Sequence, residues 1–321
     1  MLANKKFFIT GGAGFIGSHT AAKIIENNRI VVYDNLSRNA LKNFNIENHP
    51  NLEIVHGDIL DFEHLKKHIP RDVDFVLHMA AIAGVDNVIK NPARTMEINM
   101  IGTFNILKAI KELELINRIE KFVNFSTSEV FGINAFRVEE KSTTNLQPVG
   151  EGRWTYAVSK LAAEHLTYSY FKQFGLKTVT VRPFNIYGPG QVGEGAIHHF
   201  VVRAVKNEPL MIHGEGDQIR SWCYIDDMVK GILLCIEKES ASGETFNIGN
   251  PKGTITILSL AEKIIQLSNS SSEIIHVPCP YVDVELRIPS INKAKEKLGF
   301  IPEVDLNEGL KRTINWYRRK I

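Results

Sequence analysis

The sequence predicts an α/β protein, with a doubly wound parallel sheet and a second, smaller α/β domain. Short apolar segments alternate with helical patterns through the first half of the chain, a glycine-rich turn follows the first apolar segment, and polar side chains cluster where later segments end. Ligands bind at the carboxyl ends of the strands in such sheets. We expect residues 1–182 to form the first domain and residues 183–321 the second, with the chain interleaved between them.

The composition is that of an ordinary globular protein, with 321 residues, 44% of them hydrophobic and 23% charged. Lys plus Arg (38) nearly balances Asp plus Glu (36), so the net charge of +2 does not indicate a nucleic-acid partner. The three cysteines include no Cys-x-x-Cys pair, which argues against a disulfide framework and a metal site. Without a signal peptide or a long apolar run, we expect a cytoplasmic protein with no membrane partner.

The first strand is expected over residues 6–10 and leads directly into a glycine-rich turn. Gly11, Gly14 and Gly17 have the Gly-x-x-Gly-x-x-Gly spacing of a dinucleotide fingerprint, and a helix over residues 18–27 follows. In this arrangement the turn brings backbone N–H groups at a helix N-terminus against a pyrophosphate. The candidate contacts are Gly11, Gly14, Phe15, Ile16 and Gly17.

The second strand, over residues 29–33, ends at Asp34 and Asn35, which we take as cofactor contacts. A carboxylate at the end of this strand accepts hydrogen bonds from the hydroxyls of an adenosine ribose and repels a 2′-phosphate, so Asp34 favours NAD over NADP. Arg38, four residues further on, leaves NADP open as the alternative.

Two further strands are expected over residues 52–56 and 73–78, and a long helix over residues 92–115. The residues after the first of these strands lie where an adenine would be flanked, and small residues after the second let the backbone approach a cofactor, although tight packing explains small residues equally well. The candidate cofactor contacts in this part are Asp58, Ile59, Ala80, Ala81 and Asn99.

The strand expected over residues 121–125 delivers hydroxyls and a carboxylate, at Thr127, Ser128 and Glu129, to the same edge of the sheet. Tyr156 and Lys160 follow on a helix, where a spacing of four places both side chains on one face. A lysine so placed stabilises a phenolate, so we expect the pKa of Tyr156 to fall from about 10 towards neutrality and Tyr156 to act as a base.

Shorter elements follow residue 183 and form the expected second domain. Its clearest elements are a strand over 245–248 and helices over 226–237, 258–267 and from 307 onward.

Five ordered motifs resemble the extended short-chain dehydrogenase/reductase family that acts on nucleotide sugars. They are Gly11 to Gly17, Ser126 to Gly132, Tyr156 with Lys160, Arg182 to Pro189, and Gly216 to Arg220. The resemblance implies a Rossmann domain that holds NAD, a C-terminal domain that holds a nucleoside diphosphate sugar, and a homodimer. It also implies a shared first step, the oxidation of the sugar C4 hydroxyl, with Tyr156 as the base.

The residues Thr127-Ser128-Glu129 divide this family by reaction. Plain 4-epimerases resemble Ser-Ser or Ser-Ala there, and most sugar 4,6-dehydratases carry Thr-Asp-Glu. GDP-mannose dehydratases and UDP-glucuronate decarboxylases carry Thr-Ser-Glu, as here. Three other stretches resemble the decarboxylases, including the UDP-xylose synthases: residues 152–156, 220–227 and 285–291.

The resemblance therefore favours decarboxylation of UDP-glucuronate, with Thr127, Ser128, Glu129, Tyr156, Lys160 and Arg220 as catalytic residues. Oxidation at C4 makes C6 the carboxylate of a β-keto acid, so CO₂ can leave while its electrons form an enolate at C4, and C5 then takes a proton. Arg220 would hold either the carboxylate or the diphosphate, and Glu129 would order a water or donate the proton. The implied substrate contacts are Thr127, Asn185, Arg220 and Arg287.

Three alternatives remain open: a 4,6-dehydratase, a 4-epimerase, and a catalytically silent NAD-binding regulator. The presence of Thr127, Tyr156 and Lys160 argues against the silent regulator.

Overall fold

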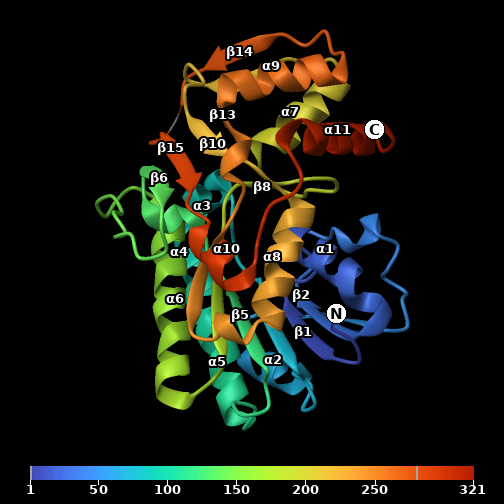
Figure 1. Cartoon of the computed structure of the whole chain (residues 1–321), viewed down its shortest axis with the longest axis vertical. Coiled ribbons are helices and arrows are strands. Elements are labelled where there is room, and N and C mark those ends of the chain that lie inside the picture. Colours follow the sequence, from blue (N-terminus) through green and yellow to red (C-terminus); the bar gives the residue numbers. More distant parts are fainter. Residues whose placement is uncertain (1, 280) are drawn as a thin grey trace.

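The computed structural model describes residues 2–279 and 281–321, and a seven-stranded sheet forms its centre (Figure 1). The strand order is β12-β7-β5-β4-β1-β2-β3, and every neighbouring pair is parallel. The strands are β1 (Lys6–Thr10), β2 (Arg29–Asp34), β3 (Leu52–His56), β4 (Phe75–His78), β5 (Lys121–Phe125), β7 (Thr178–Pro183) and β12 (Glu244–Ile248). The predicted doubly wound parallel sheet is confirmed.

Helices cover both faces of this sheet, because successive apolar residues of each strand point to opposite sides. In β1, Phe7 belongs to the core under α1 and α8, whereas Phe8 belongs to the core under α2, α5 and α6. The helices of this part are α1 (Phe15–Ile24), α2 (Phe62–His68), α3 (Val85–Lys90), α4 (Pro92–Met96), α5 (Gly102–Glu112), α6 (Trp154–Phe174) and α8 (Ile225–Glu237).

A second region lies at the carboxyl edge of the main sheet, at the top of Figure 1. Its four-stranded sheet has the order β13-β10-β15-β6, and two small two-stranded sheets pair β11 with β8 and β14 with β9. The strands are β6 (Asn134–Val138), β8 (Ile186–Tyr187), β9 (Leu210–His213), β10 (Ile219–Ser221), β11 (Cys223–Tyr224), β13 (Thr254–Thr256), β14 (Ile274–Val277) and β15 (Leu286–Pro289). The helices are α7 (Ala196–Val205), α9 (Ile257–Ser268) and α11 (Leu306–Arg318), whereas α10 (Asn292–Leu298) packs against β12 of the main sheet.

The chain passes between these two regions more than once. Strand β6 comes from the first half of the chain but pairs with β15 of the second region. Helix α8 and strand β12 come from the second half, and β12 completes the main sheet beside β7. The two regions are therefore interleaved, and a cut at residue 182 does not separate them.

The expected long helix over residues 92–115 is wrong in one respect. It is interrupted by a π-helical turn over Glu97–Ile101, which joins α4 to α5. Turns of this kind are frequent at functional sites, and this one carries Asn99. The segment between Glu129 and Gly152 contains the edge strand β6.

Candidate functional site

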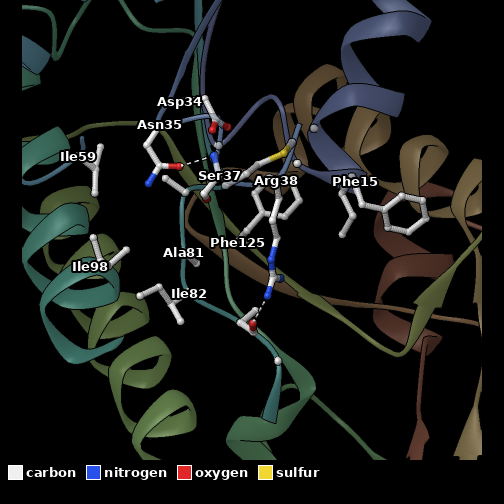
Figure 2. Close-up of a pocket in the computed structure, with 18 of the residues that line it drawn as sticks. Phe15, Asp34, Asn35, Ser37, Arg38, Ile59, Ala81, Ile82, Ile98 and Phe125 are labelled. Atoms are coloured by element: carbon white, nitrogen blue, oxygen red, sulfur yellow. Dashed lines mark hydrogen bonds between the residues drawn. The ribbon is translucent and has the colours of Figure 1, made fainter. Parts of the chain in front are cut away.

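The largest concentration of predicted site residues lines one pocket at the carboxyl ends of β1, β2, β4 and β5 (Figure 2). This is the edge at which doubly wound sheets bind ligands. The predicted residues that line it are Gly11, Gly14, Phe15, Ile16, Gly17, Asp34, Asn35, Asp58, Ile59, Ala80, Ala81, Thr127, Tyr156 and Lys160. The pocket therefore unites residues that are spread over the first half of the sequence.

The glycine turn is shaped for close approach of a ligand. Gly11 has φ +70°, and a Cβ atom there would lie 2.5 Å from the backbone nitrogen of Ala80, so only glycine fits. The hydroxyl of Ser126, which also lines the pocket, is buried without a hydrogen-bond partner among the described residues. A bare backbone turn at the start of α1 and a free hydroxyl in the same pocket fit a dinucleotide.

Asp34 lies at the end of β2 with both carboxylate oxygens engaged by backbone groups. It accepts hydrogen bonds from Ala13 N (3.0 Å) and Leu36 N (2.8 Å), and burial raises the pKa of its carboxyl. Arg38 extends away from Asp34 in Figure 2 and donates to Ala83 O (3.3 Å). Each carboxylate oxygen keeps a free lone pair that can accept a hydrogen bond from a ribose hydroxyl. This geometry favours NAD over NADP.

Tyr156 and Lys160 come from the first two turns of α6 and both line the pocket. The expected lowering of the Tyr156 pKa is wrong for the chain itself. Burial raises the pKa of Tyr156 to about 12, although the Thr127 hydroxyl lowers it. Burial also lowers the pKa of Lys160 to about 8, while Glu164 raises it. The positive charge that NAD⁺ brings when it binds favours the phenolate.

Asn99 does not line the pocket, and its neighbour Ile98 does (Figure 2). The fully buried amide of Asn99 bonds instead to both backbone groups of Ile82 and to the hydroxyl of Ser159. The assignment of Asn99 as a cofactor contact stays a prediction. The π-helical turn that carries Asn99 also carries Ile98, and it is Ile98 that lines the pocket.

A cluster of three arginines and two carboxylates, here called the arginine cluster, lies beside Tyr156. It consists of Arg153, Arg220, Arg287, Glu129 and Asp283. Glu129 pairs with Arg287 and lies 3.6 Å from Arg153 Nη2. Asp283 lies 3.2 Å from Arg153 and 3.3 Å from Arg220. Three cations against two anions leave the arginine cluster with one positive charge in excess.

The arginines keep Glu129 ionised. Burial opposes the charge, but Arg287, Arg153 and Arg220 outweigh it and hold the pKa of this carboxyl below its usual range. Burial and the two neighbouring arginines lower the pKa of Arg220 to about 10, against the effect of Asp283 and Glu129. This argues against the hypothesis that Glu129 donates a proton, because a carboxyl with a lowered pKa is deprotonated at neutral pH.

Arg287 is not the solvated charge that a surface arginine would be. Its side chain is 2% exposed and donates to Glu129 and to Gly132 O (2.9 Å). Ser128 is buried at the start of a 3₁₀ turn. The Thr127 hydroxyl caps this turn by accepting a hydrogen bond from Glu129 N. Asn185 adopts a left-handed conformation and donates to Ser221 O (3.0 Å). None of Ser128, Glu129, Asn185, Arg220 and Arg287 lines the dinucleotide pocket.

Sequence reasoning missed Arg153 and Asp283. Arg153 precedes Tyr156 by three residues, which is one helical turn, so a search for charges at that spacing would have found it. Asp283 precedes Arg287 by four residues, but they lie in an irregular segment and in β15, so helical spacing gives no signal. Only the tertiary fold brings Asp283 to Arg153.

The comparisons with known proteins agree with this geometry. The family model described as GDP-mannose 4,6 dehydratase matches residues 8–313. The chain belongs to this family. It is 36% identical to UDP-glucuronic acid decarboxylase 5 of Arabidopsis thaliana, over 96% of this chain and 88% of that protein. It is 34% identical to a UDP-N-acetyl-alpha-D-glucosaminuronate decarboxylase of Bacillus cytotoxicus, over 98% of both chains.

A solved structure is similar over nearly its whole length. UDP-glucuronic acid 4-epimerase from Bacillus cereus, in complex with UDP-glucuronic acid and NAD, superposes with a TM-score of 0.88 at 30% identity, covering 98% of this chain and 100% of that one. The predicted family of NAD-dependent nucleotide-sugar enzymes is confirmed. In residues 2–279 and 281–321 no helix has the length and apolar character to span a membrane.

Proposed function

We propose that this protein decarboxylates a UDP-linked uronate, either UDP-glucuronate or UDP-N-acetylglucosaminuronate, with NAD as a recycled cofactor. The observation that carries this proposal is the arginine cluster beside Tyr156, which has one positive charge in excess. A substrate carboxylate would neutralise that charge, whereas a neutral hexose would not.

The position of the cluster favours the carboxylate over the diphosphate. The charges of Glu129 and Arg287 act directly on the phenol of Tyr156, so the arginine cluster lies next to the group that must meet the C4 hydroxyl. In a uronate the C6 carboxylate is bonded to C5, and C5 is bonded to C4. The diphosphate is bonded to C1, on the opposite side of the ring. This proximity supports the proposal that Arg153, Arg220 and Arg287 bind the C6 carboxylate rather than the phosphates.

The residues have separable roles in this reaction. Bound NAD supplies the hydride acceptor at the start and the hydride donor at the end. Tyr156 takes the proton of the C4 hydroxyl, and the Lys160 ammonium and the bound cofactor favour the phenolate that does so. The C4 ketone makes C6 the carboxylate of a β-keto acid, so the C5–C6 bond breaks, CO₂ leaves, and the electron pair forms an enolate at C4 and C5. Protonation at C5 gives the 4-keto pentose.

The arginine cluster must allow the carboxylate to leave as neutral CO₂. An ion pair that bound the carboxylate too strongly would stabilise the ground state and slow the reaction. Glu129 and Asp283 pair with the same guanidinium groups that would bind the substrate. This competition weakens the ion pair between the arginines and the substrate carboxylate. We infer that Glu129 acts as an ionised electrostatic partner, and that the C5 proton comes from water.

Dehydration and epimerisation are the competing reactions. A 4,6-dehydratase needs an acid that protonates the departing C6 hydroxyl, and this chain has Ser128 where that acid stands in most of them. A 4-epimerase is favoured by the likeness to the Bacillus cereus protein, a UDP-glucuronic acid 4-epimerase in complex with UDP-glucuronic acid and NAD. The products of dehydration and of epimerisation both differ in mass from the product of decarboxylation.

The test is to incubate the protein and NAD separately with UDP-glucuronate, UDP-N-acetylglucosaminuronate, UDP-glucose, UDP-N-acetylglucosamine and GDP-mannose. Products are measured by mass, and the C4 configuration is determined wherever the mass does not change. We expect one of the two uronates to lose the mass of CO₂. Loss of the mass of water from a neutral sugar, or a uronate that changes only its C4 configuration, would overturn the proposal.

We also propose a homodimer formed through the helices on the α6 side of the sheet. Ile101, Phe104, Val158 and Tyr168 are apolar or aromatic side chains exposed on the π-helical turn, α5 and α6, and such a surface is typical of a subunit contact. Light scattering on the purified protein, with Phe104→Glu as the disrupting variant, tests this. The cytoplasmic location stays a prediction.

A further inference from the structure

A buried ion pair joins α6 to β7 one helical turn beyond Lys160. Arg182 donates from Nε to one carboxylate oxygen of Glu164 (2.8 Å) and from Nη2 to the other (2.7 Å). The side chains of Arg182 and Glu164 are only 7% and 9% exposed. Neither residue lines the dinucleotide pocket, although Lys160 does. The pair therefore lies next to the site without contacting the space where the cofactor would bind.

The guanidinium of Arg182 is fixed on every side. Its third nitrogen, Nη1, donates to Glu140 O (3.1 Å), and its central carbon lies 4.9 Å from the centroid of the Phe131 ring. A planar guanidinium that binds both oxygens of a carboxylate sets the orientation of that carboxylate as well as its distance. Arg182 therefore keeps the Glu164 carboxylate from turning towards another cation.

Lys160 is the cation that Glu164 would otherwise meet. The two residues are four positions apart on α6, so their Cβ atoms lie about 5–6 Å apart on one face of the helix. Both side chains are buried. In the described part of the chain, however, the Lys160 ammonium has no hydrogen bond or ion pair, and Glu164 pairs with Arg182 instead. The ammonium is thus left free in the pocket.

Glu164 still acts on Lys160 without direct contact. Burial lowers the pKa of Lys160 to about 8, and the negative charge of Glu164 opposes this effect. Without that charge the buried ammonium would lose its proton more readily. A direct ion pair with Glu164 would instead draw the ammonium along the helix and away from the pocket. The bond to Arg182 gives an arrangement between these two extremes.

We propose that Glu164 and Arg182 are positioning residues for Lys160. Glu164 favours the charged form of the ammonium, and Arg182 prevents Glu164 from pairing with it directly, so that the ammonium stays available to Tyr156 and to the cofactor. This inference rests on the proposed function only in taking Lys160 as the group that favours the Tyr156 phenolate. It also explains why a buried ion pair is found at this place, since such pairs contribute little net stability.

Lys160 is the group of the pocket that we expect to titrate between about pH 7 and 10. Burial raises the pKa of Tyr33 and of Tyr156 to about 12. Burial and the Lys160 charge lower the pKa of His78, on β4, to about 3, so this imidazole is neutral throughout the range. Glu129, in the 3₁₀ turn that packs against α6, stays ionised. The other charged residues that line the pocket are carboxylates and guanidinium groups: Asp34, Arg38, Asp58, Arg94 and Glu194.

The test uses two single variants that should shift the titration of Lys160 in opposite directions. Glu164→Gln removes the negative charge but keeps an oxygen for Arg182, so the midpoint should fall by about one pH unit. Arg182→Met releases the carboxylate to pair with Lys160, so the midpoint should rise by about one pH unit. In Arg182→Met we also expect kcat to fall about 10-fold or more, because the ammonium is displaced. A loss of packing alone gives no reason for opposite shifts.

A double variant supplies the rescue. In Arg182→Met/Glu164→Gln no carboxylate is left to capture Lys160, so kcat at about pH 6.5, where the ammonium is charged, should recover towards the wild-type value. Replacing both partners of a buried ion pair is often close to neutral for stability, so the double variant should fold even if Arg182→Met does not. A double variant that folds but is no more active at this pH than Arg182→Met would overturn the role of Arg182.

Glu140→Gln is the matched control. Glu140 also lies beside Arg182, whose charge acts on its carboxyl, but its carboxylate accepts from Asn247 N (2.8 Å) and it is not on α6. The amide oxygen of a glutamine can accept the same bond. We expect the midpoint for Lys160 in Glu140→Gln to match the wild type. A shift as large as that of Glu164→Gln would contradict the proposal.

The midpoint is measured in two ways, from kcat/KM for the nucleotide sugar that the wild type consumes and from the Kd for NAD, each as a function of pH. The Kd should rise as Lys160 loses its proton, because the pocket then loses a cation that faces an anionic cofactor. If the wild type converts none of the sugars, the proposed function fails, but the NAD titration still tests this inference. A Kd that does not depend on pH, an unmoved midpoint in Glu164→Gln, or shifts of the same sign in both single variants would overturn it.

Discussion

The dinucleotide pocket and the arginine cluster are adjacent, but they are encoded in different ways. The pocket is made by the ends of successive parallel strands, and each contribution follows a recognisable strand or turn, such as Gly11 after β1 and Asp34 at the end of β2. The arginine cluster takes residues from the turn after β5, the start of α6, β10 and the segment leading into β15. It exists only once the second region has folded against the first.

This difference separates the residues for the hydride-transfer step from the residues that we expect to select the substrate. A pocket built from local motifs suits the step that is common to every member of a family, here hydride transfer at C4. A charged cluster assembled from distant segments can change one residue at a time without disturbing the pocket. Variants of Arg153 should therefore alter which sugar is used, while variants of the pocket should affect every sugar alike.

Tyr156 lines the pocket and lies beside the arginine cluster, so its loss should have the largest effect. We expect Tyr156→Phe to lower kcat by about 10²-fold or more for any sugar that the enzyme accepts, the usual scale for a general base. NAD and sugar binding should persist, because the ring still fills the wall of the pocket. Steady-state kinetics and calorimetric titration measure the two effects. Near wild-type turnover would remove Tyr156 from the mechanism.

The sequence predicts the pocket well and the arginine cluster only in part, for physical reasons. Gly11, Asp34 and Tyr156 lie in short segments whose spacing has one structural solution. Glu129, Arg220 and Arg287 were found by resemblance, but their mutual contacts depend on β15 pairing with β6 and β10. The π-helical turn over Glu97–Ile101 was not predicted, because no proline or glycine lies between Pro92 and Gly102 to mark it.

Arg153 tests the arginine cluster alone. Arg153→Met removes the excess charge, leaving Glu129 with Arg287 and Asp283 with Arg220. We expect KM for the uronate to rise about 10-fold or more, because the loss of an ion pair to a buried carboxylate costs about 2 kcal/mol or more. The Kd for UDP should change little, and Arg153→Lys should show a partial effect. Equal weakening of UDP would place Arg153 at the diphosphate.

Glu129 distinguishes the candidate reactions. Glu129→Gln keeps the shape of the side chain and an oxygen for Arg287, but removes a negative charge from the arginine cluster. A dehydratase would lose its product, because the carboxylate removes the C5 proton there. In a decarboxylase the β-keto acid still fragments, so we expect CO₂ release to continue at about a tenth of the wild-type rate, a modest electrostatic effect.

The assay for Glu129→Gln follows CO₂ release and pentose formation together, with the wild type in parallel. Because arginines keep Glu129 ionised, the variant should not abolish C5 protonation. Complete loss of CO₂ release while C4 oxidation persists would assign Glu129 a proton-transfer role and refute its role as an electrostatic partner.

Asp34 tests the pocket alone and should give the smallest effect. Asp34→Ala removes the acceptor that faces the cofactor ribose, together with the bonds from Ala13 N and Leu36 N. We expect the Kd for NAD to rise about 10-fold, the scale of one hydrogen bond to a charged group. The Kd for NADP should rise less or fall, because the repulsion of a 2′-phosphate is also removed and Arg38 stays nearby.

Turnover at saturating NAD and the KM ratio between uronate and neutral sugar should not change, since Asp34 is not part of the arginine cluster. Titration calorimetry with both cofactors decides the matter: equal weakening of NAD and NADP would make Asp34 a support for the turn at Ala13 and not a ribose contact.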